Sequence, residues 1–335
     1  WATHGGVTVA NAHPHLDCTK TLSLVHNGIV ENNDILKNNL VSKGHRFISE
    51  TDTEVISHLI EEYLKSKPLT EAVRLAFNDL SGLNAIVVAD SSKNSIVVAK
   101  NGSPLVVGKT DKEIIAASDP SAIIPHTREV LFLEDGQMAI LNSKISVLNI
   151  ISGKFERAKF TKLDWKIENT QKGKFKHFLL KEIYEQPHVI ENSIISYREN
   201  AQKLAKLIQD AKGTFMLGCG TASYAALAGT YLFSSIARVH VNFSIGSEFS
   251  YLEDYLTEKS LLIPISQSGE TIDVIDPVNK AKNKGAKIAS VVNVMGSTLY
   301  RVSDYKFLLN AGPEKAVVST KAFIAMYSLL LLTAY

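Results

Sequence analysis

Residues 261–271 read LLIPISQSGET and give the clearest indication of the fold. The apolar run at 261–265 is typical of a buried strand, and the polar turn at 266–271 leads into a helical segment. Residues 214–221, TFMLGCGT, repeat this order of strand, glycine-containing turn and helix, and residues 287–292 add a third apolar strand. Alternating units of this kind predict a parallel sheet covered by helices.

The two turns suit the binding of a phosphate group. In an α/β sheet, ligands gather outside the carboxyl ends of the strands, where helix N-termini offer N–H groups and the positive end of the helix dipole. The turn at 218–221 supplies glycines and a hydroxyl, the turn at 266–271 supplies three hydroxyls and an amide, and residues 317–321, VVSTK, precede a third helix. Helix caps also favour Ser and Thr, but two such turns on successive units favour a ligand site. Neither GxxxxGK[ST] nor GxGxxG occurs, so a nucleoside triphosphate loop is not indicated.

These turns resemble those of the sugar isomerase (SIS) domain, which binds phosphosugars. The resemblance assigns the sugar-phosphate site to Thr221, Ser266, Gln267, Ser268, Thr271, Val317 and Ser319. The family usually has a phosphate-contacting serine where this sequence has Ala222, and the neighbouring Ser223 is the candidate substitute. Loss of one hydroxyl donor costs about 1 kcal/mol of binding. Lys321 matches a framework lysine of the family, not its Schiff-base lysine.

The first half of the chain has a different pattern, rich in short strands. Residues 83–89 and 95–99, joined by a polar turn, read as a hairpin, and further strands are expected at 104–108, 113–117 and 129–133. Apolar residues at helical spacing predict helices at 52–65 and 34–43. Lysines recur from 159 to 176 without apolar periodicity, which indicates a linker or a solvated edge of either domain.

Several short motifs in this half carry groups suited to amino-acid chemistry. Asn27 and the backbone N–H of Gly28 could both stabilise an oxyanion, and Asp52 could pair with an α-ammonium group. Each motif also has a simpler interpretation, because Asn-Gly is a common turn and Asp52 is a good helix N-cap. The histidines of this half could be core or surface residues, and a zinc site at His13 and His15 lacks a third ligand at suitable spacing.

Taken together, the segments WATHG (1–5), NAHPH (11–15), HNGI (26–29) and TDTE (51–54) resemble the class II glutamine amidotransferase domain, an N-terminal-nucleophile hydrolase fold. The resemblance implies that Asn27 and Gly28 form the oxyanion hole. It implies that Thr3, His4 and Asp52 bind the backbone groups of glutamine, and that Trp1 gates the passage of ammonia. The family's nucleophile is an N-terminal cysteine activated by its own amine. Neither Cys18 nor Cys219 matches it, and we expect it to lie ahead of Trp1.

The order of the two domains, with KEIYEQP at 181–187, resembles the glutamine–fructose-6-phosphate aminotransferase (isomerizing) family. The expected architecture is an α+β N-terminal-nucleophile hydrolase (class II glutamine amidotransferase) domain at 1–150, a linker at 151–180 and an α/β SIS domain with a parallel sheet at 181–335. The resemblance implies glutamine and fructose 6-phosphate as substrates, glucosamine 6-phosphate as product, a homodimer, and neither metal nor organic cofactor. We expect a fragment that lacks the catalytic cysteine and the C-terminal half of the isomerase domain, and that is inactive alone.

Composition limits the alternatives. Of the 335 residues 45% are hydrophobic and 21% charged, with a formal net charge of +2, which is ordinary for a globular protein and gives no sign of a nucleic-acid or membrane partner. Two distant cysteines fit a reducing, cytoplasmic location, and the uncharged run at 322–335 is too short to span a bilayer. The missing acid pair argues against a phosphoribosyl-pyrophosphate-dependent amidotransferase, and the amidotransferase half argues against a sugar deglycase and a phosphosugar-sensing SIS protein. The alternative for this chain is a phosphosugar-binding SIS module without catalysis.

Overall fold

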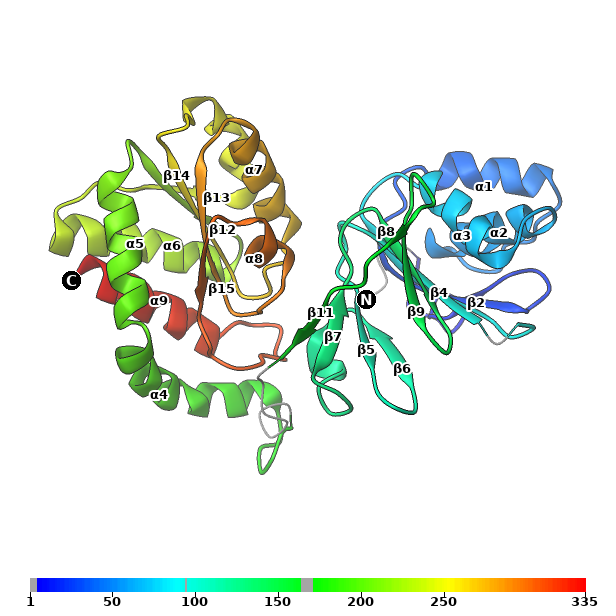
Figure 1. Cartoon of the computed structure of the whole chain (residues 1–335), viewed down its shortest axis with the longest axis horizontal. Coiled ribbons are helices and arrows are strands. Elements are labelled where there is room, and N and C mark those ends of the chain that lie inside the picture. The colour runs from blue at the N-terminus through cyan, green and yellow to red at the C-terminus, as the bar shows by residue number, and fades with distance from the viewer. Residues whose placement is uncertain (1–4, 94, 164–170) are drawn as a thin grey trace. The chain divides into compact units, whose positions relative to one another are not determined.

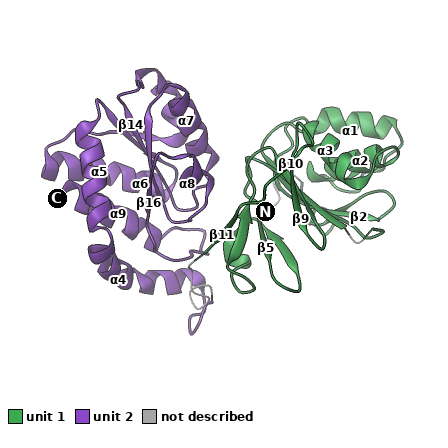
Figure 2. Cartoon of the chain, in the orientation of Figure 1, with its two compact units in different colours: residues 1–164 green, residues 165–335 purple. Residues whose placement is uncertain are grey.

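The computed structural model describes residues 5–93, 95–163 and 171–335 (Figure 1). The chain divides into two compact units, Trp1–Asp164 and Trp165–Tyr335 (Figure 2). Trp1, Thr3 and His4, to which the resemblance assigns roles, lie outside the described residues. Within the described ranges, no helix has the length and apolar character needed to cross a membrane.

Unit 1 contains two antiparallel sheets. The larger has the strand order β1 (His15–Leu16), β2 (Leu22–Gly28), β3 (Asn84–Asp90), β4 (Ser95–Asn101), β8 (Gln137–Leu141), β9 (Ile145–Asn149) and β10 (Phe155–Glu156). The smaller has the order β11 (Phe160–Lys162), β7 (Glu129–Phe132), β5 (Val106–Lys109) and β6 (Ile114–Ala117). The predicted hairpin is confirmed as β3 and β4, which pair from Asn84 with Asn101 to Asp90 with Ser95.

The larger sheet of unit 1 is buried on both faces. Helices α1 (Asn33–Ser42), α2 (Thr53–Leu64) and α3 (Leu69–Asn78) gather along the larger sheet (Figure 1). Ile86 and Val88 of β3 belong to the core that the sheet shares with these helices, whereas Ala85 belongs to a second core with strands of the smaller sheet. This alternation is the period-2 pattern of a strand, and it gives unit 1 a helix–sheet–sheet order of layers. The predicted helices at 34–43 and 52–65 are confirmed as α1 and α2.

The segment expected to be a linker, 151–180, is partly built into unit 1. Phe155–Glu156 pairs with β9, and Phe160–Lys162 pairs with β7, so both form edge strands of the two sheets. Charged side chains suit exposed strand edges because they discourage pairing with other chains, which explains the lysine-rich composition up to residue 162.

Unit 2 is a three-layer α/β/α unit around one parallel sheet. The strand order is β13 (Asn242–Ile245), β12 (Thr214–Gly218), β14 (Leu261–Ser266), β15 (Lys287–Val292) and β16 (Tyr305–Leu308), and every pairing is parallel. The helices are α4 (Phe178–Ser196), α5 (Arg198–Asp210), α6 (Thr221–Leu232), α7 (Ile272–Asn283), α8 (Thr298–Val302) and α9 (Lys321–Ala334). The predicted parallel sheet is therefore confirmed.

Two apolar cores lie on the two faces of this sheet. Met216 and Ile263 pack with α5, α6 and α9, and their neighbours Leu217 and Leu262 pack with α7 and α8. Both faces are covered, as parallel sheets require, which explains the continuous apolar run of β14. The loops that follow β12 and β14 emerge side by side, because these two strands are adjacent and parallel.

Candidate functional site

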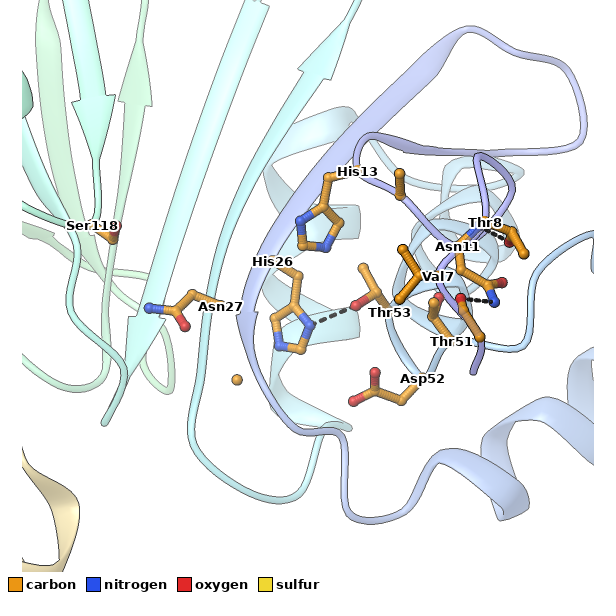
Figure 3. Close-up of a pocket in the computed structure, with 13 residues that line it drawn as sticks. Val7, Thr8, Asn11, His13, His26, Asn27, Thr51, Asp52, Thr53 and Ser118 are labelled. Carbon is orange, nitrogen blue, oxygen red and sulfur yellow. Dashed lines mark hydrogen bonds between the residues drawn. The ribbon is translucent and has the colours of Figure 1, made fainter. Parts of the chain in front are cut away.

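A cavity of 740 Å³ in unit 1 contains three of the predicted glutamine-site residues. Asn27, Gly28 and Asp52 all line it. Figure 3 shows the side chains of Asn27 and Asp52. Its other lining residues are Gly6, Val7, Thr8, Asn11, Ala12, His13, His26, Thr51, Thr53 and Ser118. The site is thus formed by the segment before β1, the end of β2, the start of α2 with the residues just before it, and the loop after β6.

The end of β2 directs its side chains to opposite sides. His26 is buried, with Nδ1 2.9 Å from Thr53 Oγ1 and Nε2 2.8 Å from Asn84 Oδ1. Because the amide oxygen of Asn84 only accepts hydrogen bonds, Nε2 carries the proton and Nδ1 accepts from the hydroxyl of Thr53. Asn27 is exposed and points to the other side of the strand (Figure 3). The strand therefore uses His26 for anchoring and leaves the amide of Asn27 available to a ligand.

Gly28 has a backbone conformation and a close contact that exclude a side chain. Its φ is +144°, and a Cβ atom at this position would lie 2.1 Å from the carbonyl oxygen of Leu83. Glycine alone tolerates both conditions, so its choice is dictated by backbone geometry. The backbone can then approach a ligand closely beside the amide of Asn27.

The carboxylate of Asp52 is directed away from the helix that follows it. Asp52 occupies the N-cap position of α2, as predicted, but its side chain makes no cap hydrogen bond. Its Oδ2 instead accepts the backbone N–H of Val30 at 2.7 Å, and the residue is only 1% exposed. A buried carboxylate at a cavity wall attracts a cation strongly because little water screens it.

The loop before Asp52 is held by one carboxylate of α2. Glu54 accepts the N–H groups of Ile48 and Ser49 at 2.8 and 2.7 Å and the hydroxyl of Ser49 at 2.6 Å. Although burial raises its pKa, hydrogen bonds from His58, Ser49 and Ile48 lower the pKa to about 2. The ionised Glu54 therefore fixes the loop that delivers Thr51, Asp52 and Thr53 to the cavity.

Acidification from pH 7.5 to 5.5 is expected to destabilise unit 1. Burial lowers the pKa of His15 and His26 below the ordinary value near 6.5, whereas the carboxylates of Glu54 and Glu61 raise the pKa of His58 despite its burial and offset part of the effect. The unfolded chain therefore binds protons at a higher pH than the folded chain, and stability is lost as the pH falls through 6.5. Thermal unfolding at a series of pH values measures this loss, which is at most about 1.4 kcal/mol per pH unit for each histidine.

The variant His26→Gln should unfold with a shallower pH dependence than the wild type. The exposed His126 lies in a loop between strands, outside the residues that line the cavity, and His126→Gln is the matched control. An unchanged slope in His26→Gln would contradict the assignment of this pH dependence to the buried ring.

The second predicted site lies at the carboxyl end of β14 in unit 2. Ser266 Oγ accepts the N–H of Gly269 at 3.0 Å and lies 3.0 Å from Thr271 Oγ1, and Ser268 Oγ accepts the N–H of Glu270 at 3.1 Å. Gly269 has φ of +68°. The turn is therefore preorganised, with its hydroxyls ahead of the N-terminus of α7, where the helix dipole favours an anion.

The first turn, after β12, lies against the start of α7. A Cβ atom on Gly246 would lie 2.8 Å from Cys219 Sγ and 2.3 Å from the carbonyl oxygen of Asp273, so these three residues are in close contact. Thr221 begins α6 at this turn. Ser223, the candidate substitute for the missing serine, is buried and donates its hydroxyl to the carbonyl of Gly220 at 2.7 Å. Its proton is engaged within the helix turn, so this conformation does not offer Ser223 as a phosphate donor.

The third predicted segment is connected to the second turn through Asn293. This residue donates its N–H to Gln267 O at 3.2 Å and its amide to Gly312 O at 2.7 Å. Farther along, Glu314 accepts the hydroxyl of Ser319 at 2.8 Å, whereas Val317 is 84% exposed. The segment that leads to α9 is thus fixed on the same side of the unit as the second turn.

Lys321 is engaged in the framework of unit 2. The residue is only 2% exposed, and its ammonium group lies 2.6 Å from Glu185 Oε2 on α4. A neighbouring carboxylate on the same helix, Glu182, accepts the N–H of Lys315 at 2.6 Å. Both contacts join α4 to the segment before α9, which fits the framework role expected for Lys321.

Some residues of the sites were not predicted from the sequence. Ser118 lines the cavity of unit 1 without a predicted role, and Thr53 and Asn84 anchor His26. Asn293 in unit 2 carries no motif. The alternation of β2 could have indicated a buried partner for His26, but nothing local identifies Asn84 or Asn293.

Comparison with known families defines the class of each unit. Residues 7–125 match the model of the glutamine amidotransferase domain, and residues 207–335 match the SIS domain. The chain is therefore a two-domain protein in which a glutamine amidotransferase domain precedes a SIS domain.

Curated relatives match the whole chain. Glutamine–fructose-6-phosphate aminotransferase [isomerizing] of Thermus thermophilus is 42% identical over 339 residues, which cover 100% of this chain and 56% of the relative. The protein of the same name from Thermococcus kodakarensis is 43% identical with the same coverage. A solved structure, the C-terminal domain of glucosamine-fructose-6-phosphate aminotransferase from Francisella tularensis, is 33% identical with a TM-score of 0.45 and covers 49% of this chain and 48% of that chain. The chain is homologous to these aminotransferases along its whole length and spans about half the length of the curated relatives it matches.

Proposed function

We propose that the chain carries the glutamine site and a phosphosugar site of a glutamine–fructose-6-phosphate aminotransferase (isomerizing). In this reaction glutamine is hydrolysed, its ammonia is transferred to fructose 6-phosphate, and isomerisation gives glucosamine 6-phosphate for amino-sugar synthesis. The observation that carries the proposal is the convergence of Asn27, Gly28 and Asp52 on one cavity, in a chain related to these enzymes along its whole length.

In unit 1, the buried carboxylate of Asp52 binds the α-ammonium group of glutamine. Asn27 and the N–H of Gly28 then stabilise the oxyanion that develops at the side-chain amide during acyl transfer, and donors aimed at this charge are worth about 3 kcal/mol each. Thr3 and His4 are proposed to complete glutamine binding, and Trp1 to gate the ammonia. The two stacked antiparallel sheets support an N-terminal-nucleophile hydrolase fold for this unit.

The thiol nucleophile of this reaction is assigned to neither cysteine of the chain. Cys18 is not among the residues that line the cavity, and Cys219 follows β12 in unit 2. In the proposed mechanism a cysteine amine–thiol pair outside this sequence attacks the glutamine amide.

In unit 2, the proposed phosphosugar site comprises Thr221, Ser266, Gln267, Ser268, Thr271, Val317 and Ser319. The hydroxyls of the second turn bind the phosphate at the N-terminus of α7, and Gln267, whose backbone is tied to Asn293, orients the sugar. Thr221 and Ser319 contact the sugar from the neighbouring segments. The site needs no metal or organic cofactor, since the sugar reacts through its own carbonyl group.

The remaining organisation follows the same proposal. The amidotransferase domain occupies 1–150 in the family scheme, residues 151–180 connect it to the SIS domain at 181–335, and the complete enzyme is a cytoplasmic homodimer. The first domain extends into the connecting segment, because unit 1 ends at residue 164 and includes the edge strands β10 and β11.

Calorimetric titration of the 335-residue chain with glutamine and, separately, with fructose 6-phosphate tests the proposal. Binding of each ligand at one site per chain is the expected result. Binding of fructose 6-phosphate alone would favour the alternative of a phosphosugar-binding SIS module without catalysis, and binding of neither ligand would refute both.

The variant Ser268→Ala is expected to bind fructose 6-phosphate roughly 10- to 100-fold more weakly. A hydrogen bond to a charged group contributes about 1.5–3 kcal/mol. In the ligand-free turn, Ser268 Oγ accepts the N–H of Glu270, and this contact does not use the hydroxyl proton of Ser268. The exposed Ser234 lies in the helical segment Phe233–Ala237 that follows α6, and Ser234→Ala is the control. Equal affinity of Ser268→Ala and the wild type would remove Ser268 from the site.

A further inference from the structure

We propose that unit 1 contains a structural zinc site formed by Cys18, His45, His58 and Glu61. These residues come from three segments: the loop between β1 and β2, the loop before α2, and α2 itself, where His58 and Glu61 share one face. One donor atom from each residue lies within 4.8 Å of all the others. The group is distinct from the residues that line the cavity.

The distances between the donor atoms fit one metal ion. Cys18 Sγ lies 3.9 Å from His45 Nδ1 and 3.6 Å from His58 Nδ1, and Glu61 Oε2 lies 3.0 Å from each of these nitrogens. Zinc bonds of about 2.0–2.3 Å in tetrahedral geometry give donor–donor distances of roughly 3.3–3.8 Å. Shifts of a few tenths of an ångström would therefore place all four atoms around a central ion.

The surroundings of the two histidines match those of metal ligands. Each ring presents Nδ1 to the group and Nε2 to a carboxylate: His45 Nε2 lies 3.0 Å from Glu62 Oε2, and His58 Nε2 lies 3.5 Å from Glu54 Oε1. An outer carboxylate that holds the second ring N–H is the usual partner of a metal-bound histidine, because it fixes the tautomer that leaves the other nitrogen free to ligate. His45 has such a partner at hydrogen-bond distance, whereas His58 Nε2 makes no well-aligned hydrogen bond within the described residues and lies only at ion-pair distance from Glu54. The His45–Glu62 pair is therefore the second observation, independent of the donor distances.

The surroundings of Cys18 can accommodate a metal-bound thiolate. Cys18 Sγ accepts the backbone N–H of Arg46 at 3.4 Å, but partial burial and the carboxylate of Glu61 raise the pKa of the free thiol, so the thiolate needs the positive charge of the bound metal. One thiolate and one carboxylate balance the charge of Zn²⁺, and binding releases the thiol proton to solvent. The mixed donors favour zinc over magnesium or calcium, and four protein ligands indicate a closed, structural site. Cys18 is exposed and so provides a path for the ion to enter.

The proposed zinc site would stabilise the segments that line the glutamine cavity. His45 and His58 flank Thr51, Asp52 and Thr53 in the sequence, and Cys18 precedes β2, which carries Asn27. A metal bound by all three segments ties them together without contacting the ligand. Its expected effect is a higher melting temperature of unit 1, since an ion that binds the folded state stabilises it.

Metal titration of the full chain, reduced with a phosphine, tests the proposal. We expect one equivalent of Zn²⁺ by mass spectrometry, a rise in melting temperature with Zn²⁺ and, with Co²⁺, a thiolate-to-cobalt charge-transfer band together with tetrahedral d–d bands. Cys18→Ser should lose the charge-transfer band and bind zinc at least 100-fold more weakly. Cys219→Ser, which removes the other cysteine, is the matched control and should retain both.

A second variant separates a metal site from a simple hydrogen-bond network. Glu62→Gln keeps all four ligands but weakens the partner of His45, and it should lower zinc affinity about 10- to 100-fold. Absence of stoichiometric zinc, or of the charge-transfer band in the wild-type chain, would overturn the proposal whether or not Cys18→Ser folds. Persistence of the band in Cys18→Ser would place the thiolate ligand elsewhere and overturn it as well.

Discussion

Replacing Gly28 by alanine is expected to lower the melting temperature of unit 1 by roughly 6–12 °C, and to abolish glutamine binding. The new Cβ would lie 2.1 Å from the carbonyl oxygen of Leu83, a rigid backbone atom, and φ of +144° is itself unfavourable for alanine. Backbone strain and overpacking together cost about 3 kcal/mol of unfolding free energy. For a unit as large as unit 1, this loss corresponds to the stated fall in melting temperature. Thermal unfolding followed by circular dichroism measures the loss, and calorimetry measures binding.

A glycine with a positive φ but no clash provides the control for Gly28. Gly136 also has positive φ, +76°, but a Cβ atom there would meet nothing within 4 Å. Gly136→Ala therefore reports the strain alone, and it should shift the melting temperature by less than half as much while glutamine binding persists. Equal shifts in the two variants would contradict the role of the contact with Leu83.

The variant Asp52→Asn is expected to weaken glutamine binding about 100-fold. The amide is nearly isosteric and its oxygen can still accept the N–H of Val30, so the fold should survive. What disappears is the negative charge at the cavity wall. Removing one partner of a buried ion pair costs about 3–5 kcal/mol, and about 3 kcal/mol corresponds to the stated factor. Calorimetry of the variant with glutamine measures the change.

An exposed aspartate serves as the control for charge. Asp111 lies in the loop between β5 and β6, and Asp111→Asn removes the same charge outside the residues that line the cavity. Its glutamine affinity should equal that of the wild type. If Asp52→Asn binds glutamine with wild-type affinity, the α-ammonium group is bound by another residue.

Much of the fold could be predicted because its elements are locally encoded. The strand predicted at 287–292 is β15, and the helix predicted at 52–65 is α2 within one residue at each end. Such segments combine apolar periodicity with turn residues at both ends. The short strands β10 and β11 could not be predicted, because their residues are exposed and their pairing with β9 and β7 is decided by distant segments.

The sites show the same limit at the level of single side chains. Motifs predicted that Asn27, Gly28 and Asp52 would act together, and all three line one cavity. Sequence could not show that the side chain of Asp52 bonds to Val30 instead of to the N-terminus of α2, or that the proton of Ser223 is engaged by Gly220. These outcomes depend on rotamers and backbone directions that the whole fold determines.

The proposed zinc ligands show why a spatial cluster escapes motif analysis. Metal motifs are recognised when ligands recur at short, regular spacing. Cys18, His45 and His58 are widely separated in the sequence, and only His58 and Glu61 lie one helical turn apart. The sequence therefore led us to expect no metal, and the three-dimensional arrangement motivates the opposite proposal.

The topology of the larger sheet sets the order in which unit 1 can assemble. β3 pairs with β4 across a short turn, as β8 does with β9, whereas β2 pairs with β3 only after the chain has closed a loop that contains α1, α2 and α3. Closing a long loop costs entropy before any contact compensates for it, so local hairpins form first. The strand that carries His26, Asn27 and Gly28 is therefore among the last to be placed. His26, Asn27 and Gly28, whose geometry is the most demanding, thus join a sheet whose hairpins have already formed. The preformed hairpin limits the ways in which β2 can pair in a non-native register.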